Sequence, residues 1–105
     1  MNNWNVGKDL RDDKRYRIKD INVIARNSWQ AFFDYMPIEH RTVCRRIQRG
    51  PLCDVFLLDE RSYRGANSPN RQATTSRETD FLGREQLEWL KSELLRSRAV
   101  WKVIA

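Results

Sequence analysis

The spacing of apolar residues along the chain predicts two helices. From about Lys19, apolar side chains recur every three or four residues and trace one broad helical face. Pro37 ends this first helix, because proline cannot continue the backbone hydrogen bonding. The second helix is the stretch LGREQLEWLKSELLRS, which places Leu87, Leu90 and Leu94 on one face. Acidic residues near its start and basic residues near its end agree with the helix dipole.

Three aromatic residues, Trp29, Phe32 and Phe33, lie on the apolar side of the first helix. Aromatic side chains at helical spacing are typical of a hydrophobic core, so we expect them to be buried. The alternative is a platform on which nucleic-acid bases stack.

The remaining apolar runs predict three strands. The first extends from about Thr42 to Gln48, and the sequence RGP at Arg49–Pro51 supplies a turn. The second, Leu52–Leu58, is apolar except for Asp54, which suits a strand covered on both faces and predicts the most buried element of the chain. The last run, VWKVIA at Val100–Ala105, predicts another buried strand that needs neighbours.

Together these elements predict an α+β fold with two helices, a β-hairpin and a C-terminal strand. The 105 residues form one domain at most. Residues 1–17 and 60–80 are polar and without periodicity, and we expect them to be loops. A polar loop as long as 60–80 is either functional or disordered. Its start, Asp59, follows directly on a buried strand, where a rigid scaffold can hold reactive side chains.

Composition and charge limit the kinds of ligand and metal site that the chain can form. The net charge of +6 rests on 15 Arg and 5 Lys, and arginine binds phosphate bidentately. Cys44 and Cys53 are outside any CxxC motif and are expected to be buried free thiols. His40 has no second histidine to support a zinc site built by this chain. No apolar run is long enough to span a membrane, and no secretory signal is visible.

The basic charge also allows a rival hypothesis, a small arginine-rich module that binds nucleic acid. The arginines in question are Arg11, Arg15, Arg17, Arg26, Arg41, Arg45, Arg46 and Arg49. They are scattered over loops, a helix and a strand, without an RNP-like aromatic strand or helix-turn-helix spacing. We therefore expect no nucleic-acid partner and keep this function as the alternative.

Three blocks of sequence carry a family resemblance. They are NNW at Asn2–Trp4, RGPLCDVFLLDERSYRGANS at Arg49–Ser68, and FLGREQLEWLKSELLRSRAVWKVIA at Phe81–Ala105. In this order and spacing they resemble the alkaline phosphatase D family, the PhoD-like metallophosphatases. The resemblance covers nearly all of the chain, and LDxRSYRG together with LGxEQLxWL is its most specific part.

The resemblance implies a metal-dependent phosphomonoesterase or phosphodiesterase with a metallophosphatase-like α/β sandwich. Its substrate would be a phosphate ester, and its cofactors divalent or trivalent metal ions such as calcium or iron. Members of this family are often exported, although the chain itself does not indicate a compartment.

The resemblance also implies roles for particular residues. Asp59 matches the acid of LDxRxYR and is the candidate metal ligand, and Asn2 and Asn3 match the NN pair beside the family's metal site. Arg61 and Arg64 match the arginines of the same motif. The resemblance implies that one of them lies near the phosphate or pairs with Asp59.

Both arginines are therefore candidate catalytic residues, and Asn67 is a candidate substrate-binding residue. The acidic DDH-type segment that precedes the NN pair in the family, and its downstream histidine ligands, are not present in the sequence. We therefore expect residues 1–105 to be a partial PhoD-like domain, incomplete at both ends. Such a chain lacks a complete site, does not hold metal stably and is inactive by itself, because flanking segments are missing.

Overall fold

The computed structural model of the chain describes residues 4–38, 42–69 and 71–105. Its elements, in chain order, are α1 (Ile21–Tyr35), β1 (Arg45–Arg49), β2 (Cys53–Leu57), the short 3₁₀ helix η1 (Arg77–Thr79), α2 (Arg84–Arg96) and β3 (Trp101–Ile104). The predicted α+β class, with two helices, a hairpin and a C-terminal strand, is confirmed. The predictions for Asn2, Asn3 and His40 fall outside the described residues.

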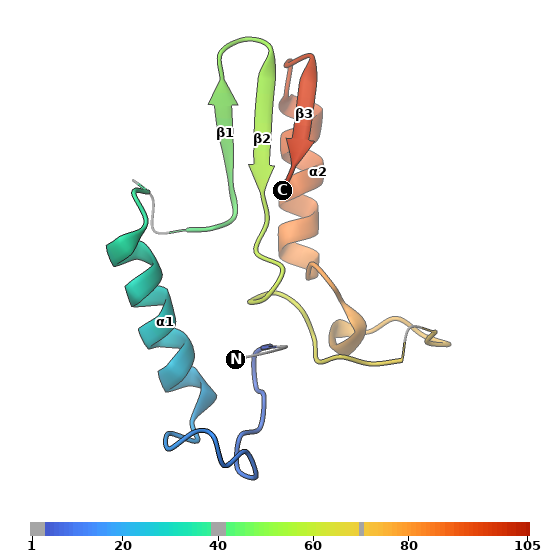
Figure 1. Cartoon of the computed structure of the whole chain (residues 1–105). Coiled ribbons are helices and arrows are strands. Elements are labelled where there is room, and N and C mark those ends of the chain that lie inside the picture. Colours follow the sequence, from blue (N-terminus) through green and yellow to red (C-terminus); the bar gives the residue numbers. More distant parts are fainter. Residues whose placement is uncertain (1–3, 39–41, 70) are drawn as a thin grey trace.

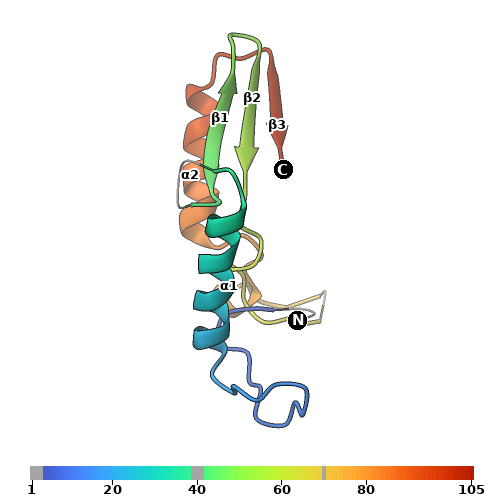
Figure 2. The ribbon, with the colours of Figure 1, turned by 60° about the vertical axis from the view of Figure 1, so that its left-hand side comes forward.

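The three strands form one mixed sheet in the order β1-β2-β3. The hairpin makes β1 and β2 antiparallel, whereas β3 returns after α2 to lie parallel to β2. Helix α2 is the crossover that parallel strands require, and it lies along one face of the sheet (Figures 1 and 2). Helix α1 lies beyond the end of the sheet, apart from α2.

The hairpin strands are shorter than the sequence predicts. Leu52 belongs to the turn, which is allowed by the left-handed backbone of Gly50 (φ +64°), so that β2 begins at Cys53. β1 begins at Arg45 rather than Thr42, because β2 ends at Leu57 and leaves no partner for the preceding residues. The Arg45 guanidinium instead donates to the carbonyl oxygens of Thr42 and Val43, at 2.8 and 3.3 Å.

An ion network joins the sheet to α2. The Arg46 guanidinium lies 2.7 Å from the Asp54 carboxylate and 3.2 Å from the Glu93 carboxylate. Ser97 donates a short hydrogen bond to the same Asp54 carboxylate, which is only 2% exposed. The Ser97 hydroxyl and the nearby guanidinium lower the pKa of Asp54. The one polar residue of β2 is therefore buried and bonded to Arg46 of β1 and to Ser97, the residue that follows α2.

The opposite face of the sheet is apolar and open. Ile47, Val55 and Val103 lie in one cross-strand row, and Trp101 beside them is 69% exposed. Burial therefore alternates along β2: two of its five residues are buried and none is exposed. The expectation that both faces of β2 are covered is wrong for the described residues. The predicted C-terminal strand is present as β3, and its residues are exposed because the neighbours that the sequence predicts for it are not among the described residues.

Helix α1 is well bounded but poorly covered. The Asp20 side chain caps its first turn by accepting from the Asn22 N–H at 2.8 Å, and the helix ends at Tyr35, two residues before Pro37. Only Ile21 of this helix is buried, and Phe32 is 39% exposed. The expected aromatic core is therefore not formed by the described residues.

The chain is extended for its length. Its radius of gyration is 16.6 Å, compared with about 13 Å expected for a compact domain of this size. A helix long and apolar enough to cross a membrane is not found among the described residues.

Candidate functional site

Asp59 lies two residues beyond the end of β2 and is fixed there by α2. Its backbone N–H donates to Oε1 of Gln86 at 2.7 Å, and the Gln86 amide donates back to the Asp59 carbonyl oxygen at 3.2 Å. The same amide donates to the Leu82 carbonyl oxygen at 3.0 Å, and Gln86 is only 1% exposed. Helix α2 thus holds the end of the strand through a reciprocal pair of buried hydrogen bonds.

The Asp59 carboxylate shapes the loop that follows. Its Oδ1 accepts from the backbone N–H groups of Arg61 and Ser62, at 2.9 and 2.8 Å. This side-chain-to-backbone turn is typical of aspartate at the start of a loop. The second oxygen, Oδ2, has no hydrogen-bond partner among the described residues. One oxygen of a nearly buried carboxylate is therefore available to another group.

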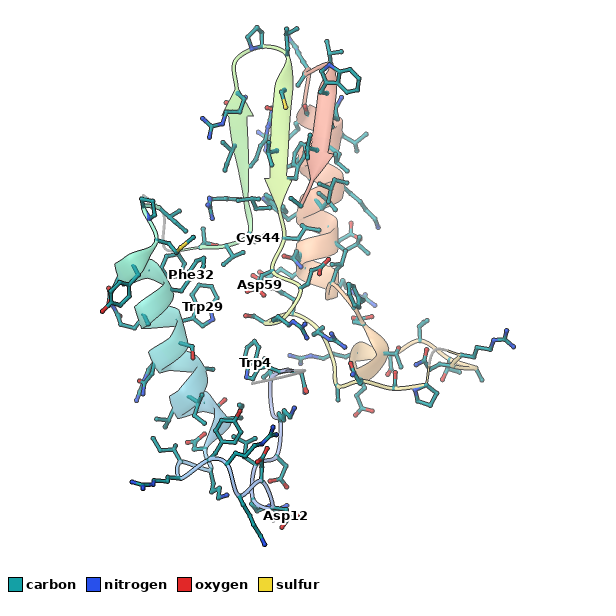
Figure 3. All side chains as sticks on the ribbon, viewed as in Figure 1. Trp4, Asp12, Trp29, Phe32, Cys44 and Asp59 are labelled. Carbon is teal, nitrogen blue, oxygen red and sulfur yellow. The ribbon has the colours of Figure 1, made fainter. Side chains whose placement is uncertain are left out.

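A pocket of about 400 Å³ lies between α1 and this loop. Figure 3 shows Trp29 and Phe32 on the α1 side, Asp59 on the strand side and Trp4 below the space between them. The lining residues are Trp4, Ile24, Ala25, Ser28, Trp29, Phe32, Val43, Asp59, Arg61 and Ser62. The pocket is of the size that proteins use to bind small ligands.

The structure separates the two arginines of the RSYRG motif. Arg61 lines the pocket beside Asp59, and its guanidinium has no hydrogen-bond or ion-pair partner among the described residues. Arg64 instead donates a short hydrogen bond to Asn67 and lies over the Phe81 ring, 5.4 Å from its centroid. These three residues line a different pocket. Neither arginine side chain pairs with Asp59.

Two glycines fix the course of the loop between β2 and α2. The Gly65 N–H donates to the Asp80 carbonyl oxygen at 2.9 Å, and a Cβ at Gly65 would lie 2.1 Å from the Glu78 carbonyl oxygen. Gly83 has a positive φ of 71° and lies against the Tyr63 backbone, where a Cβ would come within 2.9 Å of the carbonyl oxygen. The glycines of RSYRG and LGREQ are thus required by close backbone contacts.

Two ionisable groups near Asp59 have raised pKa values. Burial and the nearby carboxylates of Asp59 and Glu85 raise the pKa of the Cys44 thiol, which therefore stays protonated at neutral pH. Burial also raises the pKa of Tyr63. Cys44 and Cys53 are free and half-buried, so they are less buried than the sequence predicts.

The residues that the structure describes do not by themselves form a metal site. Across 4–38, 42–69 and 71–105, no group of three or more His, Cys, Asp or Glu side chains is arranged to hold an ion. A hard cation takes about six oxygen donors, and Asp59 offers one free oxygen.

Asp59 and Arg61 are candidates from the sequence, and the structure places three further residues around them that the sequence did not single out. Gln86 stands inside the LGREQ block as one polar residue on a largely polar helix surface, and only its burial distinguishes it. Trp4 follows the NN pair, and its place in the pocket depends on the folded chain. Cys44 was expected in a strand but precedes β1.

Four of the described arginines form ion pairs with carboxylates. They are Arg11, Arg15, Arg46 and Arg96. Part of the basic charge is therefore neutralised within the chain, and the alternative of a nucleic-acid-binding module gains no support from the structure.

Comparison with known proteins gives a consistent family. A curated relative, alkaline phosphatase D of Bacillus subtilis (strain 168), is 28% identical over 92 residues. The alignment covers 74% of this chain and 16% of the relative, so the chain spans about a sixth of that protein. No solved structure matches the chain significantly. The PhoD-like phosphatase family matches residues 1–105, and the chain belongs to that family.

Proposed function

We propose that the chain is part of a metal-dependent hydrolase of phosphate monoesters or diesters, in which Asp59 contributes a metal ligand. The observation that carries this proposal is the Asp59 carboxylate, which is fixed at a strand end and keeps one oxygen without a partner among the described residues. The two hydrogen bonds that Oδ1 accepts from the loop hold the Asp59 side chain in one orientation. A carboxylate held in this way suits a hard cation such as calcium or iron. The other ligands come from elsewhere, with Asn2 and Asn3 as candidates in this chain.

The two motif arginines differ in their proposed roles. Arg61 has an unpaired guanidinium in the same pocket as Asp59, which suits binding of the phosphate group and its developing charge. Arg64 and Asn67 are bonded to each other, so a contact with substrate requires that bond to open first. We therefore propose that Arg61 acts on the substrate and that Arg64 and Asn67 hold the loop.

We also propose that residues 1–105 are a partial domain whose missing segments cover the open face of the sheet. The apolar row of Ile47, Val55 and Val103 and the unpaired edge of β3 favour a further layer and a further strand. The extended shape supports the same proposal. A sandwich with α2 on one face and this layer on the other is the architecture that the family resemblance implies.

The metal-ligand proposal is tested in the complete protein that carries this segment, with p-nitrophenyl phosphate as substrate. Asp59→Asn retains the oxygen that accepts from Arg61 and Ser62 but removes the charge, so we expect an intact fold. Removal of a group that only hydrogen-bonds to a metal ligand costs about 10- to 100-fold in metal affinity or activity. Loss of a direct ligand is therefore expected to cost about 100-fold or more in kcat/KM. Bound metal should fall in parallel.

The matched control is Asp12→Asn, because Asp12 is exposed and lies far from the pocket (Figure 3). The control is expected to retain activity and metal. If Asp59→Asn retains both as well, Asp59 serves only to shape the loop and the proposal is wrong.

The chain of 105 residues is expected to be inactive by itself, because the residues that the structure describes fix too few ligands for a metal-bound nucleophile. The assay uses p-nitrophenyl phosphate and its bis ester, with calcium, iron, manganese or zinc supplied in turn. Turnover above a metal-only blank that is lost in Asp59→Ala would contradict this expectation.

A further inference from the structure

The pocket between α1 and the loop after β2 has two chemically different sides. The α1 side is largely apolar and presents Ile24, Trp29 and Phe32. The loop side presents Asp59 and Arg61. A space with an apolar wall and a charged wall suits a ligand that has an apolar body and a charged end.

Two hydrogen-bond donors at this pocket lack acceptors among the described residues. The indole Nε1 of Trp4 is buried and has no hydrogen-bond partner. This donor is enclosed by protein atoms and is not itself open to the pocket. The Arg61 guanidinium is the second free donor, and it is positively charged. The exposed Arg61 side chain favours an occupant that carries oxygen acceptors and negative charge.

The apolar wall is open to such an occupant. Phe32 is 39% exposed although it is a large aromatic residue, and Trp29 is half-buried with its ring stacked on Phe33 at a centroid distance of 5.0 Å. Trp29 and Phe32 lie three residues apart on one helix and both line the pocket, so they form one aromatic surface. An aromatic ring gains stacking or edge contacts on a surface of this kind, beyond the burial of its area.

We propose that this pocket binds an aromatic phosphate ester, with its aromatic ring against Trp29 and Phe32 and its phosphate oxygens toward Arg61. The volume of about 400 Å³ exceeds the roughly 150 Å³ cavity that accommodates benzene, and so leaves room for a ring and its phosphate. The inference rests on the proposed function and adds a substrate class to it: esters with a flat apolar group are preferred over small polar ones.

Binding is tested by titrating the 105-residue chain with phenyl phosphate in the presence of EDTA, so that metal plays no part. Trp89→Phe and Trp101→Phe are introduced first, because Trp4 and Trp29 then remain as the fluorescent residues at the pocket. We expect a saturable change in fluorescence. The affinity for phenyl phosphate should exceed that for inorganic phosphate and for phenol by about tenfold each, since each probe lacks half of the contacts.

Two pocket variants separate the two ends of the ligand. Arg61→Gln should weaken phenyl phosphate about tenfold and leave phenol unchanged, because a charge-assisted bond is lost. Phe32→Ala should weaken both phenyl phosphate and phenol by about two- to tenfold. The matched controls are Arg84→Gln and Leu95→Ala, which alter exposed residues of α2 away from the pocket. Circular dichroism verifies that each variant retains the helices of the parent chain.

The inference fails if phenyl phosphate does not saturate, if phenol or phosphate binds equally well, or if the control variants weaken binding as much as the pocket variants do. Its failure is distinguishable from that of the proposed function. Asp59→Asn should leave phenyl phosphate bound in EDTA, or bind it more tightly because a repelling carboxylate is removed, whatever its effect on turnover. If instead Asp59→Asn abolishes binding in EDTA, the ligand is not held as proposed.

Discussion

The reciprocal hydrogen bonds between Gln86 and Asp59 lead to the most specific prediction about stability. Gln86→Met keeps the length and approximate volume of the side chain but removes its amide. The Asp59 N–H, bonded at 2.7 Å to the Gln86 Oε1, then has no acceptor in a buried position. The carbonyl oxygens of Asp59 and Leu82 lose their donor as well.

The expected cost follows from these three bonds. A buried donor left without a partner costs about 1–3 kcal/mol. Each of the two carbonyl oxygens adds less, because a carbonyl oxygen has two lone pairs and can accept a hydrogen bond from another donor. We therefore expect Gln86→Met to lower the free energy of unfolding by about 2–4 kcal/mol. For a chain of this size, that loss corresponds to a fall in Tm on the order of 10 °C.

The assay is urea unfolding followed by circular dichroism, combined with amide hydrogen exchange at Asp59. Exchange of the Asp59 N–H should accelerate in Gln86→Met, because its acceptor is gone. Gln30→Met is the matched control, since Gln30 is exposed and bonded only to Asp34 within α1, at 2.6 Å. The control should change stability by less than about 0.5 kcal/mol. If the two variants are equally stable, or exchange at Asp59 is unchanged, the bond does not hold the strand end.

Three further predictions concern other parts of the fold. Gly65→Ala should destabilise the loop and speed its cleavage by trypsin near Arg64, because the added Cβ would lie 2.1 Å from the Glu78 carbonyl oxygen. The control is Gly50→Asn, whose Cβ would have no atom within 4 Å and whose side chain tolerates a positive φ, so cleavage near Arg64 should be unchanged. The pKa of Asp54 is lowered in the folded chain, so its contribution is present above about pH 3.8 and is lost as the pH falls below that value. The urea midpoint should therefore fall more steeply with acid in the parent chain than in Asp54→Asn, and equal slopes would contradict the network with Ser97 and Arg46. Val103→Lys should reduce self-association of the chain in sedimentation, because it places a charge on the open apolar face, whereas Lys102→Arg should not; unchanged association would argue against that face as the cause.

The order and kind of the elements could be predicted from the sequence because local patterns determine them. The apolar period near Ile21–Tyr35 gives α1, Pro37 limits it, and the RGP sequence turns the hairpin. The RSYRG and LGREQ blocks identified the family from the sequence alone. The reason for their glycines lies in backbone contacts with Glu78 and Tyr63, which are distant in sequence.

Only the tertiary structure decided how these residues are used. From the sequence, Asp54 is the one polar residue of an otherwise apolar strand. Its burial is possible because Arg46 from the neighbouring strand and Ser97 after α2 bond to its carboxylate. Arg61 and Arg64 are equivalent in the motif, and only the folded loop gives one a pocket and the other a partner in Asn67. Burial of Phe32 and Val103 was expected from hydrophobicity, but burial requires a covering element, and the described residues supply none. Hydrophobicity sets which side chains favour burial, whereas contacts between segments distant in sequence determine which of them achieve it.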